Sequence, residues 1–419
     1  MVAKDIWKRN WGGNSMEWKE VTLGEIGTIV GGATPSTKNT SFYDGNIPWL
    51  TPKDLSVNSN KYILRGERNI TEAGFKSCSC KMLPKGSVLF SSRAPIGYVA
   101  ITANDMCTNQ GFKSVIPNEE TDSEFLYYLL KYNKDNIASQ GSGTTFAEVS
   151  GKTMKEIEVM VPKETDDQRR IASILSSLDR KIELNNKINA DLEEMAQAIF
   201  KNWFVDFEPF KDGKFVDSEL GMIPEGWKVG SLGDMGTIVC GKTPSKANSN
   251  YYGGDIPFIK IPDMHGKVFV ESSEDRLTEQ GSLSQIKKLI PPYSLMVSCI
   301  ATVGLVSINT KPSHTNQQIN TIIPHNKSAL FYLNQYIKNN EELLKNMGRG
   351  GTTTLNVNTK SFSNIRLFIP SDIALLQFHQ IVEGLFKKIE LNMQESRTLS
   401  TLRDTLLPRL MSGEIEVPE

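Results

Sequence analysis

The chain has 419 residues, of which 39% are hydrophobic, 23% charged and 8% aromatic. This composition excludes a disordered, collagen-like or disulfide-dense protein, and the length predicts two or three domains with substantial cores. Its 47 basic and 48 acidic residues leave a formal net charge of -1, whereas a dedicated nucleic-acid-binding protein is often strongly basic, so tight binding of such a ligand would depend on local patches or on partners.

The remaining global features predict a soluble protein of the cytoplasm with no membrane span and no metal. No apolar run approaches the ~18 residues that cross a bilayer, and residues 1–16 hold no apolar signal core and stay unassigned. The five cysteines are odd in number and scattered, which favours reduced thiols over a zinc site. The four histidines show no spacing typical of a metal or nucleophile site, so we expect surface or packing roles for His265, His314, His325 and His379.

The chain contains an internal duplication. The segment "GTIVGGATPSTKNTSFYDGNIPWL" at 27–50 returns as "GTIVCGKTPSKANSNYYGGDIPFI" at 236–259, 209 positions later. The segment "TNQGFKSVIP" from Thr108 matches "TNQQINTIIP" from Thr315, and "KIELN" from Lys181 recurs at Lys388, both 207 positions later. Because the period is far longer than that of a solenoid repeat, it indicates duplication of a whole structural unit.

Each copy is predicted to be a β-rich domain followed by a long helix, so the expected fold class is α+β. Short apolar alternations such as "EIGTIV" and "EIEVMVP" are separated by Gly, Pro, Asn and Ser clusters, and one internal helix is expected near "SEFLYYLLKYN". In chain order we predict an arm over 1–16, a first β-rich domain over 17–162, a central helix over 163–205, a linker over 206–226, a second β-rich domain over 227–370, a C-terminal helix over 371–413 and a tail over 414–419.

The central helix carries one continuous apolar seam. It is expected to open with a capping box between Thr165 and Gln168, after which apolar residues follow at three- and four-residue steps. Asn185 and Asn189 interrupt this seam, and Asn392 of the C-terminal helix matches Asn185. Since a buried Asn facing another Asn fixes helix register, Asn185 and Asn392 favour pairing of the two helices. The alternative is that each helix packs only on its own domain.

Several blocks together resemble the specificity subunit of type I restriction-modification systems, over nearly the whole chain. They are the "TPS" and "TNQ" blocks of both copies, "LDRKIELN" with "FKNWFVDFEP", "GMIPEGW" from Gly221 and "LLPRLMSGEI" from Leu406. The resemblance implies two target-recognition domains held apart by a pair of antiparallel spacer helices, each domain reading half of a split target in double-stranded DNA. It also implies that catalysis and cofactor lie elsewhere: modification subunits bind S-adenosylmethionine and methylate adenine, and a motor-nuclease restriction subunit cuts.

The sequence contains no convincing catalytic motif of its own. "IPPY" at Ile290 is similar to the adenine-methyltransferase tetrapeptide, but isoleucine replaces the Asn or Asp that would bind the amino group, so a turn before the strand "SLMVSCI" is the better interpretation. No Gly-rich phosphate loop ending in Lys-Ser or Lys-Thr appears. A non-catalytic DNA-reading scaffold is therefore favoured over a self-sufficient DNA methyltransferase or nuclease, and S-adenosylmethionine binding by the isolated chain would separate the two hypotheses.

Differences between the two copies indicate candidates for base readout. A side chain that specifies a base should differ between copies that read different sequences, whereas one that grips phosphate or supports a loop can be identical. Arg and Lys can pair with guanine acceptors, and Asn or Gln with adenine. The alternative for each candidate is a solvated surface residue. The candidates are Lys53 and Lys260, one step out of register, Arg93 against Ile300, Gln318 against Gly111, and Lys113 against Asn320.

Shared polar residues are candidates for loop support or for contact with the DNA backbone. They are Thr34 and Thr243, Asn109 and Asn316, Gln110 and Gln317, Thr144 and Thr352, and Thr145 and Thr353. Lys152 and Lys360, just after the "GTT" blocks, are candidate phosphate clamps. Arg349 lies in "GRGGTTT", where glycines would let the backbone approach a ligand or would simply form a flexible turn.

Overall fold

The computed structural model describes residues 16–57, 60–93, 95–142, 147–349 and 355–417. The chain divides into two compact units, one formed by residues 1–184 together with 396–419 and the other by residues 185–395. Each long helix is therefore shared between the units, and the C-terminal residues belong to the first unit.

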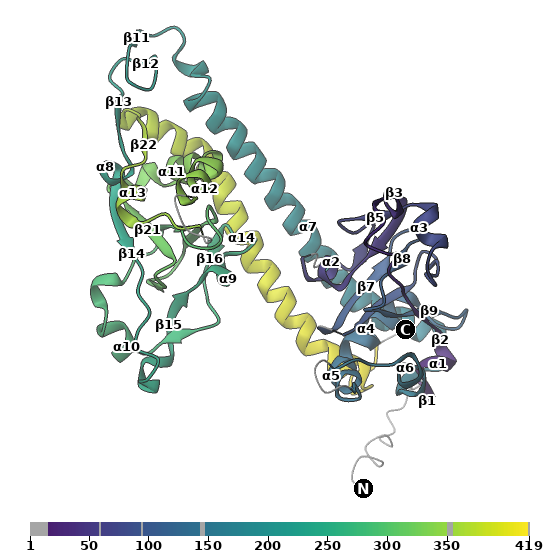
Figure 1. The fold of residues 1–419 in the computed structure, drawn as a ribbon. Coiled ribbons are helices and arrows are strands. Elements are labelled where there is room, and N and C mark those ends of the chain that lie inside the picture. Colours follow the sequence, from purple (N-terminus) through teal and green to yellow (C-terminus); the bar gives the residue numbers. More distant parts are fainter. Residues whose placement is uncertain (1–15, 58–59, 94, 143–146, 350–354, 418–419) are drawn as a thin grey trace. The chain divides into compact units, whose positions relative to one another are not determined.

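The first unit combines two sheets, a strand pair and several short helices (Figure 1). Its five-stranded sheet has the order β2-β9-β6-β7-β4, its three-stranded sheet has the order β5-β3-β8, and β1 pairs with β10. The strands are β1 (Trp18–Thr22), β2 (Gly27–Gly31), β3 (Tyr43–Leu50), β4 (Tyr62–Ile63), β5 (Asn69–Ile70), β6 (Val88–Ser92), β7 (Ile96–Thr102), β8 (Cys107–Thr108), β9 (Lys113–Pro117) and β10 (Glu158–Pro162). The helices are α1 (Leu23–Ile26), α2 (Pro52–Val57), α3 (Glu72–Lys76), α4 (Ser123–Tyr132), α5 (Lys134–Ser139) and α6 (Gly151–Glu156).

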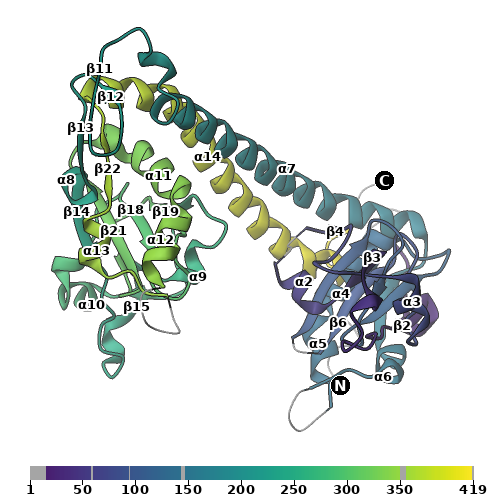
Figure 2. The same ribbon diagram turned by 45° about the horizontal axis from the view of Figure 1, so that its top comes forward.

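The second unit repeats this arrangement (Figure 2). Its sheets have the orders β14-β21-β18-β19-β16 and β17-β15-β20, β13 pairs with β22, and β11 (Phe215–Val216) pairs with β12 (Ile223–Pro224) in the linker. The other strands are β13 (Lys228–Ser231), β14 (Gly236–Cys240), β15 (Tyr252–Ile259), β16 (Phe269–Val270), β17 (Arg276–Leu277), β18 (Leu295–Ser298), β19 (Val306–Asn309), β20 (His314–Thr315), β21 (Ile319–Pro324) and β22 (Arg366–Ile369). The helices are α8 (Leu232–Met235), α9 (Ile261–Met264), α10 (Glu279–Leu283), α11 (Leu330–Asn339), α12 (Glu341–Gly348) and α13 (Thr359–Ser363).

Strand register confirms the duplication at the level of single residues. Gly27 of β2 faces Pro117 of β9, and Gly236 of β14 faces Pro324 of β21, so each shared "GTIV" segment pairs with the corresponding strand of its own unit in the same register. The helix expected near "SEFLYYLLKYN" is α4, and α11 takes its place in the second unit.

Two helices of 40 residues each, α7 (Thr165–Phe204) and α14 (Asp372–Met411), contact one another in both units. In the first unit, Arg403 of α14 binds Asp179 of α7 at 2.6 Å. In the second, the Asn392 side chain donates to Asn189 at 2.9 Å. Because residue numbers fall along α14 as they rise along α7, the helices are antiparallel within each unit, which confirms the predicted helix pair.

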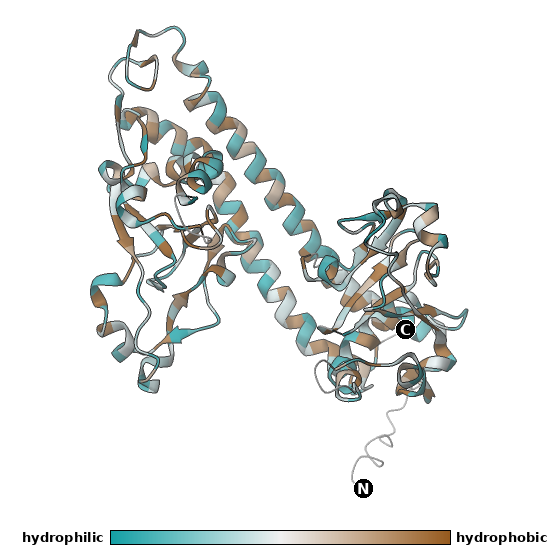
Figure 3. Cartoon of the chain, in the orientation of Figure 1, coloured by the Kyte–Doolittle hydropathy of each residue, from teal (hydrophilic) through white to brown (hydrophobic). Residues whose placement is uncertain are grey.

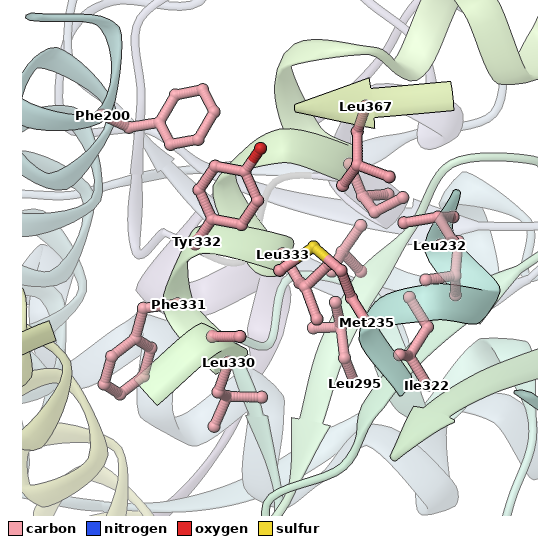
Figure 4. Close-up of a cluster of buried hydrophobic side chains, with 14 of the residues drawn as sticks. Phe200, Leu232, Met235, Leu295, Ile322, Leu330, Phe331, Tyr332, Leu333 and Leu367 are labelled. Atoms are coloured by element: carbon pink, nitrogen blue, oxygen red, sulfur yellow. The ribbon is translucent and has the colours of Figure 1, made fainter. Parts of the chain in front are cut away.

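Both long helices also pack against the domains, so packing on a domain accompanies helix pairing and the alternative of packing on a domain only is wrong. In Figure 3 hydrophobic and hydrophilic residues alternate along α7 and α14, as expected for helices with a buried side. Figure 4 shows Phe200 of α7 beside Tyr332 of α11, with ring centroids 5.7 Å apart. Leu295 of β18 and Ile322 of β21 complete the same cluster from the sheet.

The capping box expected at the start of α7 is wrong. The Thr165 hydroxyl donates to the carbonyl of Glu120 at 3.0 Å, and the Gln168 amide oxygen accepts from the backbone of Asp122 at 2.9 Å. These side chains tie α7 to the loop before α4, because that loop lies within their reach and competes with the helix's own first turn.

Buried His314 of β20 makes the second unit sensitive to acid. It occupies the place of Cys107 in β8, donates to or accepts from the Ser282 hydroxyl at 2.8 Å, and is fully buried. Burial lowers the pKa of His314 from 6.5 to about 4. His314 therefore binds a proton below pH 6.5 in the unfolded chain, but only below about pH 4 in the folded unit.

We expect the stability that neutral His314 provides to be complete above pH 6.5 and to be lost progressively as the pH falls to about 4. The slope should be about 1.4 kcal/mol per pH unit in this window. Urea unfolding at a series of pH values measures it. His314→Gln should flatten the profile, while the same change at exposed His325 should leave it as it is. An unchanged slope in His314→Gln would contradict the assignment.

Candidate nucleic-acid interface

One end of the five-stranded sheet in the first unit collects several of the predicted site residues. The end of β6, the start of β9 and the end of β2 lie together there. The Ser92 backbone N–H donates to Gly111 at 2.8 Å, and Gly31 faces Lys113. We call this edge 1 and define it by Thr34, Arg93, Gln110, Lys113 and Glu148. The corresponding end of the second sheet, edge 2, is defined by Thr243, Gln317, Gln318, Asn320 and Thr359.

Edge 1 holds two cations around one carboxylate. The Lys113 ammonium lies 3.1 Å from Glu148, and the Arg93 guanidinium lies 3.7 Å from the other carboxylate oxygen. Arg93 and Glu148 are each partly exposed. In this arrangement Glu148 orients and partly neutralises both cations, and an incoming phosphate or guanine edge would compete with it for them.

Edge 2 is uncharged at the equivalent positions. Asn320 replaces Lys113, is 3% exposed, and accepts a hydrogen bond from the Thr359 hydroxyl at 2.9 Å. The Gln318 side-chain oxygen accepts from the Asn316 amide at 2.9 Å, while the Gln318 backbone donates to the oxygen of Asn316. The two edges thus present different chemistry on the same backbone frame.

Glu148 is not among the residues predicted from the sequence, although the duplication contains a signal for it. Arg93 forms an isolated bridge with Glu148, and Ile300 forms the same bridge with Asn356. The charged pair of one copy is therefore replaced by an uncharged pair in the other, a paired difference that two aligned copies can reveal.

The shared residues hold the loops that frame each edge. The Thr34 hydroxyl donates to the Gln110 side chain, and Thr243 donates to Gln317 at 2.7 Å in the same way. Asn109 accepts the backbone N–H of Gly111 at 2.8 Å. These contacts are consistent with the predicted role of the shared residues in supporting loops. Contact of the same residues with the DNA backbone remains a prediction.

The tyrosine of the "TPS" motif also serves this frame. Tyr43 donates its hydroxyl to the carbonyl of Pro35 at 2.7 Å, and Tyr252 donates to Pro244 at 2.8 Å. The spacing between "TPS" and the tyrosine therefore allows one side chain to pin the loop in both copies.

Lys53 and Lys260 lie outside the two edges and do not correspond to each other. The backbone N–H groups of Thr51 and Lys260 donate to Asp54 and Asp263, at 2.7 and 2.8 Å, so Lys260 is the counterpart of Thr51. The prediction that Lys53 and Lys260 are one position out of register is wrong. Because Asp54 corresponds to Asp263, Lys260 lies two positions before the counterpart of Lys53. Lys53 pairs instead with Glu67, and Lys260 pairs with Asp275.

The remaining basic candidates lie on short helices or at their ends. Lys152 of α6 is exposed and lies 3.9 Å from Glu156. Lys360 of α13 borders a shallow groove with Thr237 and His325. Arg349 follows α12 and donates to Asn346 at 2.7 Å. The "GTT" candidates Thr144, Thr145, Thr352 and Thr353 lie outside the described residues.

The predicted asparagines of the helix seam lie together in the second unit. The Asn185 side chain donates to the backbone carbonyl of Asn392 at 3.4 Å and to Glu395 at 2.8 Å. Both asparagines are 1% exposed. Their burial between the two helices fits the predicted role in helix register.

The described part of the chain contains no group of three or more His, Cys, Asp or Glu residues arranged to hold a metal ion. Every helix within it is also too short or too polar to span a bilayer.

Comparison with known proteins gives concordant results. The sequence model described as "Type I restriction modification DNA specificity domain" matches residues 15–194 and again residues 224–400. The chain is 37% identical over 414 residues to the type I restriction enzyme MjaIX specificity subunit of Methanocaldococcus jannaschii, covering 96% of this chain and 94% of that protein. It is 35% identical to the HindI specificity subunit of Haemophilus influenzae, covering 95% of this chain and all of that protein.

The fold is similar to that of a solved structure at low sequence identity. The S subunit of a type I restriction-modification system from M. genitalium aligns with a TM-score of 0.57 and 16% identity over 98% of each chain. The predicted α+β class, with two duplicated β-rich domains and a pair of long helices, is thereby confirmed.

Two adjacent glycines in the frame of edge 1 give a matched test of the loop packing. A Cβ on Gly32 would lie 2.2 Å from the carbonyl oxygens of both Thr108 and Asn109, whereas a Cβ on Gly31 would make only ordinary contacts. Gly32→Ala should therefore destabilise the protein by about 1–3 kcal/mol, and Gly31→Ala should cost less than about 1 kcal/mol. Chemical unfolding measures both. Equal losses would show that "TNQ" does not clamp the loop.

Proposed function

The chain belongs to the family of type I restriction modification DNA specificity domains, and from this premise we propose that it is the DNA-recognition subunit of a type I restriction-modification enzyme. It binds a bipartite target in double-stranded DNA and directs modification and restriction subunits to that target in the cytoplasm. It is a non-catalytic subunit, and S-adenosylmethionine belongs to the modification subunit.

The duplicated edges carry this proposal. The loops at the two edges are held in the same way, by the Thr34–Gln110 hydrogen bond in one and the Thr243–Gln317 hydrogen bond in the other. The side chains at matching positions differ between them, with a charged set in edge 1 and amides in edge 2. A protein that reads two different half-sequences needs this combination, because the frame can be constant while the base contacts must change. A self-sufficient methyltransferase or nuclease has no supporting observation.

Reconstitution tests the proposal. The purified chain alone should transfer no methyl group to DNA, whereas the chain with its modification subunit should methylate adenine at one split target. Sequencing of methylated adenines in a host that expresses both proteins gives the target directly. Methyl transfer by the purified chain alone, or unspecific methylation by the pair, would refute the proposed function.

The two edges should be separable by mutation. Arg93→Ala should weaken recognition of one half-sequence by about 1–3 kcal/mol if the guanidinium contacts a base in two places, and Gln318→Ala should act on the other half-sequence. Competition binding by the complex on duplexes altered in one half-site measures this. A uniform loss on all duplexes would assign these residues to phosphate contact or to folding.

A further inference from the structure

Edge 1 and the equivalent part of the second unit each contain one pair of facing residues. In the first unit Arg93 and Glu148 form an isolated antiparallel bridge, which we call bridge pair 1. In the second unit Ile300 and Asn356 form the same kind of bridge, which we call bridge pair 2. Residues that face each other in an antiparallel bridge project their side chains to the same side, with Cβ atoms about 5 Å apart. Each pair therefore presents two neighbouring side chains to one ligand.

The backbone beside both pairs is fixed in the same way. Next to bridge pair 1, the Val149 N–H donates to the Ser92 carbonyl at 3.0 Å. Next to bridge pair 2, the Val357 N–H donates to the Cys299 carbonyl at 2.8 Å. These four neighbours are buried, whereas all members of the bridge pairs are partly or fully exposed. Exposed side chains on a rigid, buried support are suited to precise recognition.

Bridge pair 1 matches the major-groove edge of a G·C base pair. Guanine presents two acceptors there, O6 and N7, and cytosine presents the N4 amino donor beside O6. A guanidinium supplies two donors for guanine, and a carboxylate accepts from the cytosine amino group. The Arg93 guanidinium and the Glu148 carboxylate lie 3.7 Å apart and are 35% and 39% exposed, so both can reach adjacent atoms of one base pair.

Lys113 provides the charge that a carboxylate in a DNA groove requires. The phosphates repel such a carboxylate unless a cation neutralises it. The Lys113 ammonium lies 3.1 Å from Glu148, closer than the Arg93 guanidinium, and is only 15% exposed. Its counterpart Asn320 is 3% exposed, so this position is largely enclosed in both units. Lys113 can therefore keep Glu148 neutralised while Arg93 turns to guanine.

Bridge pair 2 matches an A·T base pair instead. In the major groove thymine presents a methyl group that favours an apolar side chain, and adenine presents a donor and an acceptor that suit an asparagine amide. Ile300 is partly exposed and Asn356 is exposed. Both members of the pair thus differ from those of bridge pair 1, and the combination suits the other kind of base pair.

We propose that each bridge pair reads one base pair of its half-sequence, a G·C pair in the half bound by the first unit and an A·T pair in the half bound by the second. Lys113 is the counter-ion of Glu148 and makes no base contact. The inference rests on the proposed function for DNA as the ligand. As a structural ion pair alone, Arg93 and Glu148 would contribute little, because both side chains are more than a third exposed.

An exchange between the units tests the proposal in the full chain with its modification subunit. The combined variant Arg93→Ile, Lys113→Asn and Glu148→Asn gives the first unit the three residues with which the second unit folds. Sequencing of methylated adenines should then show A·T in place of G·C at one position of the first half-sequence. Competition binding should show a roughly tenfold or greater loss of preference for G·C there. The other half-sequence should not change.

Single changes separate base reading from support, on duplexes altered one base pair at a time. Glu148→Asn and Arg93→Ala should each lower the preference at that same G·C pair roughly tenfold. Lys113→Met should weaken binding to every duplex without changing the preference, because Glu148 then meets the phosphates without its cation. Glu67→Gln, which breaks an exposed ion pair with Lys53 outside edge 1, is the matched control and should change neither quantity.

A variant of the second unit makes the test independent of the stability of edge 1. Asn356→Ala, at an exposed position, should relax one A·T pair of the other half-sequence roughly tenfold. A uniform loss on all duplexes, or no loss, in both Glu148→Asn and Asn356→Ala would overturn the proposal. Effects of Arg93→Ala and Glu148→Asn at different base pairs would also overturn it. In each of these cases the wild-type complex still methylates a split target, whereas its failure to do so would refute the proposed function.

Discussion

The fold depends on the burial of two apolar helix faces that neither domain can cover alone. The first half of α7 packs with the last residues of α14 in one unit, and the second half of α7 packs with the first residues of α14 in the other. Leu410 and Met411, near the end of the chain, are fully enclosed in the core of the first unit. The first domain therefore cannot complete its core until the last helix has been made.

Much of the architecture was predictable because the duplication provides two different sequences that adopt the same fold. Many positions that are apolar in both copies, such as Leu23 and Leu232, are buried in the core, and shared polar positions such as Thr34 and Gln110 support loops that both copies need. The capping box at Thr165 failed for a different reason, since a loop distant in sequence competes for the same side chains. Local patterns cannot reveal such competition, because it depends on tertiary approach.

The candidate site was predictable in outline but not in its electrostatics. Arg93 and Lys113 were identified by their difference between copies, yet only the folded sheet end shows that both of them pair with Glu148. The left-handed backbone of Tyr293, with φ 59°, is hidden for a similar reason. A tyrosine after two prolines gives no sign of a left-handed backbone, and only the glycine at the equivalent position of the other copy indicates it.

Divergence between the copies also explains why the chain should pair its two halves with each other rather than with copies of themselves. Asp179 is buried and binds Arg403, whose counterpart in α7 is Ala196. A symmetric pair of first halves would therefore place each Asp179 against an Ala196, leaving a buried carboxylate without its cation. Loss of one partner from a buried pair destabilises by about 3–5 kcal/mol, and a two-fold pair would suffer it twice. In such a pair Asn185 would face Asn185 of the other copy. The asparagines that fix the register therefore do not prevent a symmetric pair. The Asp179–Arg403 pair adds the discrimination that the asparagines lack.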